Sequence, residues 1–208
     1  LQPGTYCGNT NINGGNITLA SGLYIIKDGN FTINGNSKVT ANGVTFLLTG
    51  SGPNFYVAGN ASLNLTPYSS GQFAGFAMYL DNNSVVTACA PYTDGGQMLK
   101  SPSMDSGFTT STKTVKQVNQ TGIANCVNAI SGTSRVTMSG IVYLANAAFI
   151  ATDSSVINLK GSFVSKYLLA DNNATMSLVG ALPSSSSIAA SMQKISQNTQ
   201  KSALRLIK

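Results

Sequence analysis

Short stretches of alternating apolar residues recur along the first third of the chain, and each is interrupted by Gly and Asn. The three clearest examples run from Ile12 to Leu19, from Phe31 to Val39 and from Phe55 to Leu65. Alternation gives a short β-strand one apolar face, and Asn-Gly or Gly-Asn supplies the positive-φ corner after it. The pattern therefore predicts pairs of short strands joined by tight corners.

The corner glycines of these stretches recur at a nearly constant interval. Gly14, Gly35 and Gly59 are separated by about 21 and 24 residues, a period typical of stacked solenoid turns. One turn cannot bury its apolar face alone, but stacked turns form a continuous core and pair their strands in parallel. Further strands are expected at 24–26 and 44–48. The sequence predicts an all-β fold, a right-handed parallel β-helix.

The pattern stops between about residues 84 and 135 and then returns. Apolar strand-like segments follow at 141–144, 148–151, 156–159, 163–169 and 176–178. We expect a β-helix domain over 1–183 from which 84–135 is a long loop excursion. Rigid scaffolds often carry function on such loops, so the excursion is a candidate binding surface as well as a candidate plain loop.

The C-terminal residues 184–208 have a different pattern. A run of four serines at 184–187 resembles a linker, and Ile188, Met192 and Ile195 follow with the spacing of one helix face. The last residues alternate as in a strand. We expect a short helix and a terminal strand that cap the open end of the solenoid, in preference to a membrane-surface helix.

The composition argues against several kinds of chemistry. The 208 residues include no His and only six acids, all of them Asp, so neither a Ser-His-Asp triad nor a His-ligated metal is expected. Each of four aspartates precedes small turn residues, the setting of an Asx-turn corner. We expect these to be structural turn positions and the protein to be no enzyme, without cofactor or metal. They are Asp28, Asp81, Asp153 and Asp171.

The formal net charge of +6 does not come from a dense basic patch. Four of the twelve basic residues lie in the last fifteen positions, and aromatic residues do not alternate with them, so nucleic-acid binding is not expected. No apolar stretch reaches the 18 residues of a membrane span. Ice binding would need threonines at one repeated position, and Thr18, Thr32, Thr40 and Thr45 show no such repetition in the sequence.

Three cysteines, Cys7, Cys89 and Cys126, leave two interpretations open. A disulfide between Cys89 and Cys126 would close the excursion and stabilise it by roughly 3–4 kcal/mol in the chain-entropy model. Alternatively, both are buried thiols. If they pair, Cys7 is left over, which fits a partner cysteine upstream of this segment.

Several ordered segments resemble one family. Residues 3–8 (PGTYCG), 19–29 (LASGLYIIKDG) and 43–50 (GVTFLLTG) are similar to TadG-like proteins of bacterial Tad (Flp) pilus systems. The later segments 73–81 (FAGFAMYLD), 139–146 (SGIVYLAN) and 204–207 (LRLI) resemble the same family. The resemblance covers most of the chain except roughly 84–135.

This resemblance implies a non-enzymatic, extracytoplasmic component of a Tad pilus, structural or adhesive, located in the periplasm, the cell envelope or the pilus itself. Its partners would be other pilin-like or pilus-assembly proteins, with a surface or glycan ligand as a further option. Membrane attachment would come from an N-terminal segment that this chain does not contain. An envelope location also favours disulfides. The family offers no catalytic residues to carry over.

The main alternative is a carbohydrate-binding or carbohydrate-cleaving β-helix of the cell surface. It predicts a groove lined by aromatic residues and acids. The tyrosines that could line such a groove are scattered in the sequence and do not decide between the two functions; they are Tyr56, Tyr68, Tyr79, Tyr92 and Tyr143.

Overall fold

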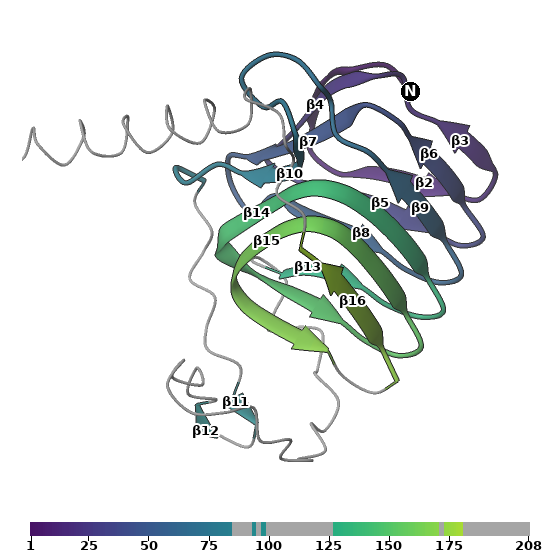
Figure 1. Ribbon diagram of the computed structural model, residues 1–208, viewed down its shortest axis with the longest axis vertical. Helices are drawn as coiled ribbons and strands as arrows, with labels where there is room; N and C mark the ends of the chain where they lie inside the picture. The colour runs from purple at the N-terminus through teal and green to yellow at the C-terminus, as the bar shows by residue number, and fades with distance from the viewer. Residues whose placement is uncertain (85–92, 95–96, 99–126, 171–172, 181–208) are drawn as a thin grey trace, which may run out of the picture.

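The protein is a β-solenoid of about six turns, built almost entirely from parallel strands (Figure 1). The structure, a computed structural model, describes residues 1–84, 93–94, 97–98, 127–170 and 173–180. These residues contain strands and turns and no helix. The predicted all-β class and the parallel β-helix are confirmed.

Each turn contributes one strand segment to each of three faces, here called sheets A, B and C. Sheet A contains β1 (Gly4–Cys7), β4 (Gly22–Lys27), β7 (Val44–Thr49) and β10 (Phe76–Leu80). Sheet B contains β2 (Thr10–Asn13), β5 (Asn30–Asn34), β8 (Asn54–Val57) and β13 (Val127–Ile130). Sheet C contains β3 (Asn16–Thr18), β6 (Lys38–Ala41), β9 (Ser62–Leu65) and β16 (Thr175–Val179).

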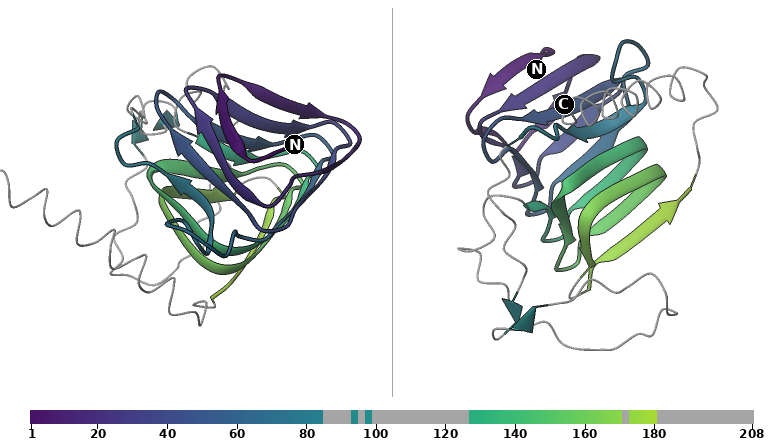
Figure 2. Two further views of the ribbon diagram at one scale, coloured as in Figure 1. Left: turned by 90° about the horizontal axis from the view of Figure 1, so that it is seen from above. Right: turned by 90° about the vertical axis from the view of Figure 1, so that its left-hand side faces the viewer.

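Two long strands pass through all three faces. The strands β14 (Arg135–Ala151) and β15 (Val156–Ala170) each start in sheet C, bend into sheet A and end in sheet B. Seen from above, the coil encloses a single interior (Figure 2). The two-residue strands β11 (Thr93–Asp94) and β12 (Gln97–Met98) pair in antiparallel fashion and form a second, two-stranded sheet.

The inward positions of successive turns stack in register and form the core. In sheet C, Val39 pairs with Ile17 on one side and with Leu63 on the other, and the column continues to Val136 and Ile157. Rings of Phe31, Phe46 and Phe55 meet in the interior at centroid distances of 4.9–5.7 Å. Alternation in the sequence thus becomes a continuous apolar column along the solenoid axis.

The corner between sheets B and C is a stack of residues with positive φ. Gly14, Gly35 and Gly59, which the sequence places at corners, have φ of 83°, 66° and 70°. Gly132 takes the same corner in turn four with φ 70°, and Asp153 takes it in turn five with φ 60°. A Cβ on Gly132 would lie 2.4 Å from the Gly59 oxygen, so close stacking as well as φ requires glycine there.

The excursion interrupts turn four between sheets A and B. β10 pairs with β7 and β14, and β13 pairs with β8 and β14, so the solenoid is continuous on both sides of the interruption. The expected excursion of 84–135 is therefore too long at its C-terminal end. Residues 127–135 already belong to turn four, because the chain rejoins sheet B at Val127.

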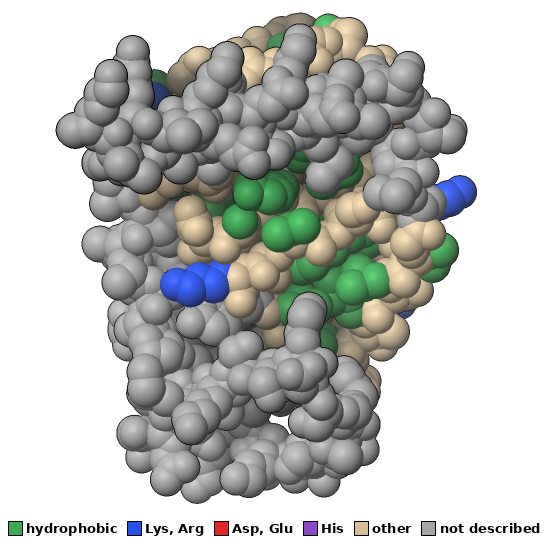
Figure 3. Space-filling model, turned by 60° about the vertical axis from the view of Figure 1, so that its left-hand side comes forward, with side chains coloured by type: hydrophobic (Ala, Val, Ile, Leu, Met, Phe, Trp, Pro, Cys, Tyr) green, Lys and Arg blue, Asp and Glu red, His purple; other side chains and the backbone are tan. Residues whose placement is uncertain are grey.

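A second apolar cluster covers the outside of sheet A. Phe76, Tyr79 and Ile141 are buried there, and Leu47, Phe73 and Tyr143 pack against them. Hydrophobic side chains gather on the side of the molecule that carries β10 and the bends of β14 and β15 (Figure 3). Every residue of β10 is consequently buried, inward and outward alike.

Two inward-facing leucines of turn six are exposed. Leu168 and Leu178 are both 47% exposed, although their register partners in turn five, Phe149 and Leu159, are only 1% and 2% exposed. The expected cap formed by residues 184–208 lies outside the described residues. Within the part of the chain that the structure describes, no further turn stacks on these inward-facing leucines.

Candidate functional site

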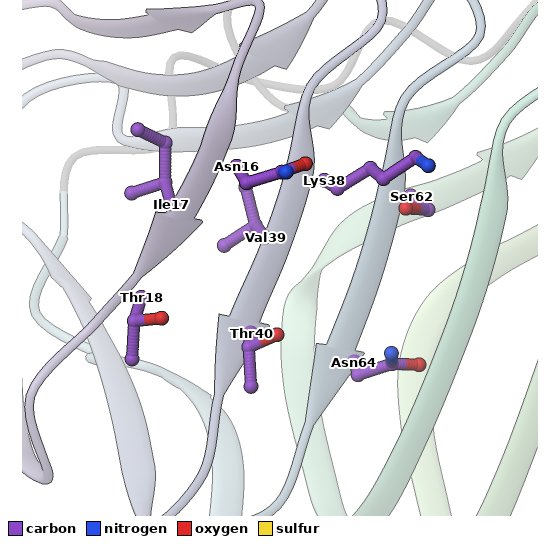
Figure 4. Close-up of a pocket in the computed structure, with 8 residues that line it drawn as sticks. All are labelled: Asn16, Ile17, Thr18, Lys38, Val39, Thr40, Ser62 and Asn64. Atoms are coloured by element: carbon purple, nitrogen blue, oxygen red, sulfur yellow. The ribbon is translucent and has the colours of Figure 1, made fainter.

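The outer surface of sheet C carries a shallow hollow of about 340 Å³. It crosses turns one to three and is lined by side chains of β3, β6 and β9 (Figure 4). Because Ile17, Val39 and Leu63 point inward or pack on the core, the residues on either side of each point outward. Two outward columns of polar residues therefore run along the solenoid axis on this face.

The first outward column contains hydroxyl and amide side chains. Thr18 pairs with Thr40, Thr40 with Asn64 and Asn64 with Thr137, and the column continues to Asn158 and Ser177. In Figure 4, Thr18, Thr40 and Asn64 stand side by side on successive strands. The expectation that the threonines share no repeated position is thus wrong for Thr18 and Thr40, and Thr137 lies in the same column.

The other two threonines do lie elsewhere. Thr32 pairs with Asn11 and Tyr56 on sheet B. Thr45 is buried in sheet A, where its hydroxyl donates to the Phe76 carbonyl oxygen at 2.6 Å. The rank on sheet C, mixed with Asn and Ser, differs from the uniform threonine rank on which the ice-binding expectation rested.

The second outward column contains two of the cations of sheet C. Lys38 pairs with Asn16 and Ser62, and Arg135 is the next residue of that column after Ser62. Lys160 lies further along β15 on the same sheet. None of these three cations forms an ion pair with an acid in the described part of the chain, and the sheet C strands contain no acid.

The described corner aspartates bind backbone and hydroxyl groups. At the corner between sheets A and B, Asp28 accepts from the Ser51 N–H at 2.7 Å. Two turns further along, Asp81 accepts from the Thr49 hydroxyl and from the Asn83 N–H, both at 3.1 Å. Asp81 thus makes the expected Asx-turn, whereas Asp28 binds the next turn of the solenoid.

Asp153 lies at a different corner, between sheets B and C. Its Oδ2 accepts from the Gly132 N–H in the preceding turn at 2.9 Å. Asp171 lies outside the described residues. The structure therefore brings Asp28 and Asp81 to one corner in turns two and four, places Asp153 at another corner, and commits each carboxylate to a hydrogen bond.

Groups that would hold a metal are not found in the described residues: no three His, Cys, Asp or Glu side chains come together there. Nor does that part of the chain contain a helix long and apolar enough to cross a membrane. Cys7 is exposed and is not in a disulfide with any described residue. Cys89 and Cys126 lie outside the described residues, so their pairing stays a prediction.

Two tyrosines that are far apart in the sequence stack on the outside of sheet A. Tyr79 and Tyr143 are register partners, and their rings lie 5.2 Å apart at an interplanar angle of 13°. Burial, followed by the neighbouring Tyr143 and Asp81, raises the pKa of Tyr79. Each ring covers one face of the other and Tyr79 is only 8% exposed, so the pair offers little open aromatic surface to a sugar.

The side chain of Asn128 closes the interrupted turn, a role that the sequence analysis missed. Asn128 pairs with Phe149 in register and is fully buried among the inward residues. Its Oδ1 accepts from the Phe55 N–H at 2.9 Å, and its Nδ2 donates to the Ala148 carbonyl oxygen at 3.5 Å. A buried amide thus joins turns three and five where β13 begins.

Comparisons of the chain with protein-family models, with curated proteins and with solved structures give no match.

Proposed function

We propose that the chain is a non-enzymatic, extracytoplasmic component of a Tad (Flp) pilus that serves as a rigid scaffold. Its partners are the pilin-like or assembly proteins of the same system. Its task is to hold the excursion between β10 and β13 away from the anchor of the protein and present it to those partners.

One observation carries the proposal: the solenoid is uninterrupted on both sides of the excursion. Turn four stacks on turn three through β7 and β8 and on turn five through β14, although its two parts are separated by residues 81–126. A long insertion at a surface corner costs little folding free energy when both ends are held close together. Such a corner is a suitable place from which to display a binding segment.

Two further features support a scaffold without catalysis. The described corner aspartates lie at two different corners and accept hydrogen bonds from backbone N–H and hydroxyl groups. These hydrogen bonds stabilise the corners of the solenoid. The segments that resemble TadG-like proteins include β4, β7 and β10, which form the continuous part of sheet A. The segments that carry the resemblance are therefore strands of the solenoid itself.

The carbohydrate-cleaving alternative finds less support in the hollow of sheet C. Its lining contains neither an aromatic residue nor an acid, and glycoside cleavage ordinarily needs a pair of carboxyl groups on either side of the bond.

The test is co-purification of the tagged protein with the pilins encoded in the same operon, from envelope extracts and from purified subunits. We expect direct association with at least one pilin-like subunit. A matched sample from a strain that lacks those pilins controls for non-specific capture. Glycan binding together with no pilin association would overturn the proposal in favour of a cell-surface carbohydrate-binding protein.

A further inference from the structure

We propose that the outer face of sheet C is a binding site for an extended acidic glycan, a linear polysaccharide that carries carboxylates. The inference rests on the hollow and the two outward columns, and it stands whether or not the protein assembles with pilins.

The charges on this face favour an anion. Lys38, Arg135 and Lys160 point outward from sheet C, whose strands contain no acid. Asp153, the aspartate nearest to Lys160 in the sequence, lies at the corner before β15 and accepts a hydrogen bond from the Gly132 N–H. Exposed cations without a described ion pair keep their charge available to a ligand in solution.

The spacing of the cations favours a ligand that lies along the solenoid axis. Ser62 separates Lys38 from Arg135 in one column, so the two cations are two strand spacings apart. Since paired strands lie about 4.8 Å apart, this is about 9.5 Å. A linear glycan in which carboxylates recur along one edge can meet both cations at once, whereas a small anion can meet only one.

The neighbouring column supplies the contacts that a sugar needs beyond charge. Thr18, Thr40 and Asn64 offer hydroxyl and amide groups at the strand spacing, directly beside the hollow (Figure 4). Such groups both donate and accept hydrogen bonds, which suits the hydroxyls of a sugar chain. The short Asn16 and Ser62 on either side of Lys38 leave the space that the hollow occupies.

The same face fits nucleic acid poorly. Single-stranded nucleic acid is held by aromatic side chains on which bases stack, and none lines the hollow. Three cations over six turns also fall short of the dense basic stripe that phosphate backbones require. An acidic glycan is therefore the ligand class that satisfies both columns.

The experiment is isothermal titration of the full chain with an oligogalacturonate, with a neutral hexose oligomer of equal length and with single-stranded DNA. We expect the oligogalacturonate to bind most tightly and its affinity to fall as NaCl increases. The double variant Lys38→Gln/Arg135→Gln should bind about fivefold more weakly or worse, the loss expected for two exposed charge pairs. Lys27→Gln, on sheet A, is the matched control and should bind as the wild type does.

A second variant separates hydrogen bonding from charge. Thr40→Val should weaken binding of the oligogalacturonate while leaving the slope of its salt dependence unchanged. The proposal is overturned if the oligogalacturonate does not bind, if the neutral oligomer or DNA binds as tightly, or if the double variant binds as the wild type does. Pilin co-purification does not enter this test, so its failure and that of the scaffold proposal are distinguishable.

Discussion

The buried amide of Asn128 accepts a hydrogen bond from the backbone N–H of Phe55, 2.9 Å away, across the boundary between turns three and four. It lies one residue after the chain rejoins the solenoid, in the interior position that apolar residues fill in neighbouring turns. The side chain therefore supplies a backbone partner at the edge of the interruption.

Replacing Asn128 by Leu should lower the free energy of unfolding by about 1–3 kcal/mol, because the buried Phe55 N–H loses its acceptor. Chemical denaturation followed by circular dichroism measures the change. Asn11→Leu, at an exposed outward position of β2, is the control and should change the stability by less than about 0.5 kcal/mol. Equal effects of the two substitutions would contradict a role of Asn128 at this boundary.

Stacking of the glycine corners predicts different costs for the same substitution. Gly132→Ala should be clearly more destabilising than Gly14→Ala, although both residues have positive φ. A Cβ at Gly132 would lie 2.4 Å from the backbone oxygen of Gly59, whereas at Gly14 it meets nothing within 4 Å. The φ penalty is common to both, about 1 kcal/mol. Their difference in thermal midpoint therefore measures the close approach between turns, and equal midpoints would argue against it.

If Asp153 has a structural role, the stability of the protein should depend on the shape of its side chain more than on its charge. Asp153→Asn should leave the stability nearly unchanged, since an amide oxygen can accept from the Gly132 N–H and Asn tolerates positive φ. Asp153→Ala should cost about 1–2 kcal/mol, because it loses the hydrogen bond and keeps the strained φ. Thermal unfolding of both variants decides the matter. A hydrolytic activity lost in the Asn variant with the fold intact would show a catalytic role instead.

The exposed leucines of turn six predict the effect of removing residues 184–208. If this segment caps the open core, the truncated chain 1–183 should be less stable and should self-associate through Leu168 and Leu178, which are 47% exposed. Light scattering and thermal unfolding measure both effects. Leu178→Gln in the truncated chain should restore the monomer. A truncated chain that remains monomeric and equally stable would mean that residues 184–208 do not cover this end.

The strands could be predicted from the sequence wherever the apolar alternation is regular. Segments 24–26 and 44–48 fall within β4 and β7, and the three repeated stretches become the B and C strands of turns one to three. The return of the chain at Val127 was missed because Asn128 occupies an inward position and breaks the alternation.

The face on sheet C could not be predicted from sequence spacing. Turns differ in length and turn four contains the excursion, so Thr40 and Thr137 share a column although they are far apart in the chain. Only the register of the strands shows which polar residues are neighbours. The register likewise places Lys38 and Arg135 in one column. It also makes Tyr79 and Tyr143 direct neighbours.

The most direct test of the proposed scaffold role is to delete the excursion while keeping the solenoid. In turn three, the five residues 49–53 lie between Leu48 and β8, whereas only four residues, 81–84, follow Leu80, the register partner of Leu48. Ser84 can therefore be joined to Val127 through one glycine. The deletion variant is compared with the wild type in circular dichroism, thermal unfolding and pilin co-purification. We predict an intact β-solenoid that no longer associates with the pilins. A folded deletion variant that binds the pilins as well as the wild type does would contradict the account.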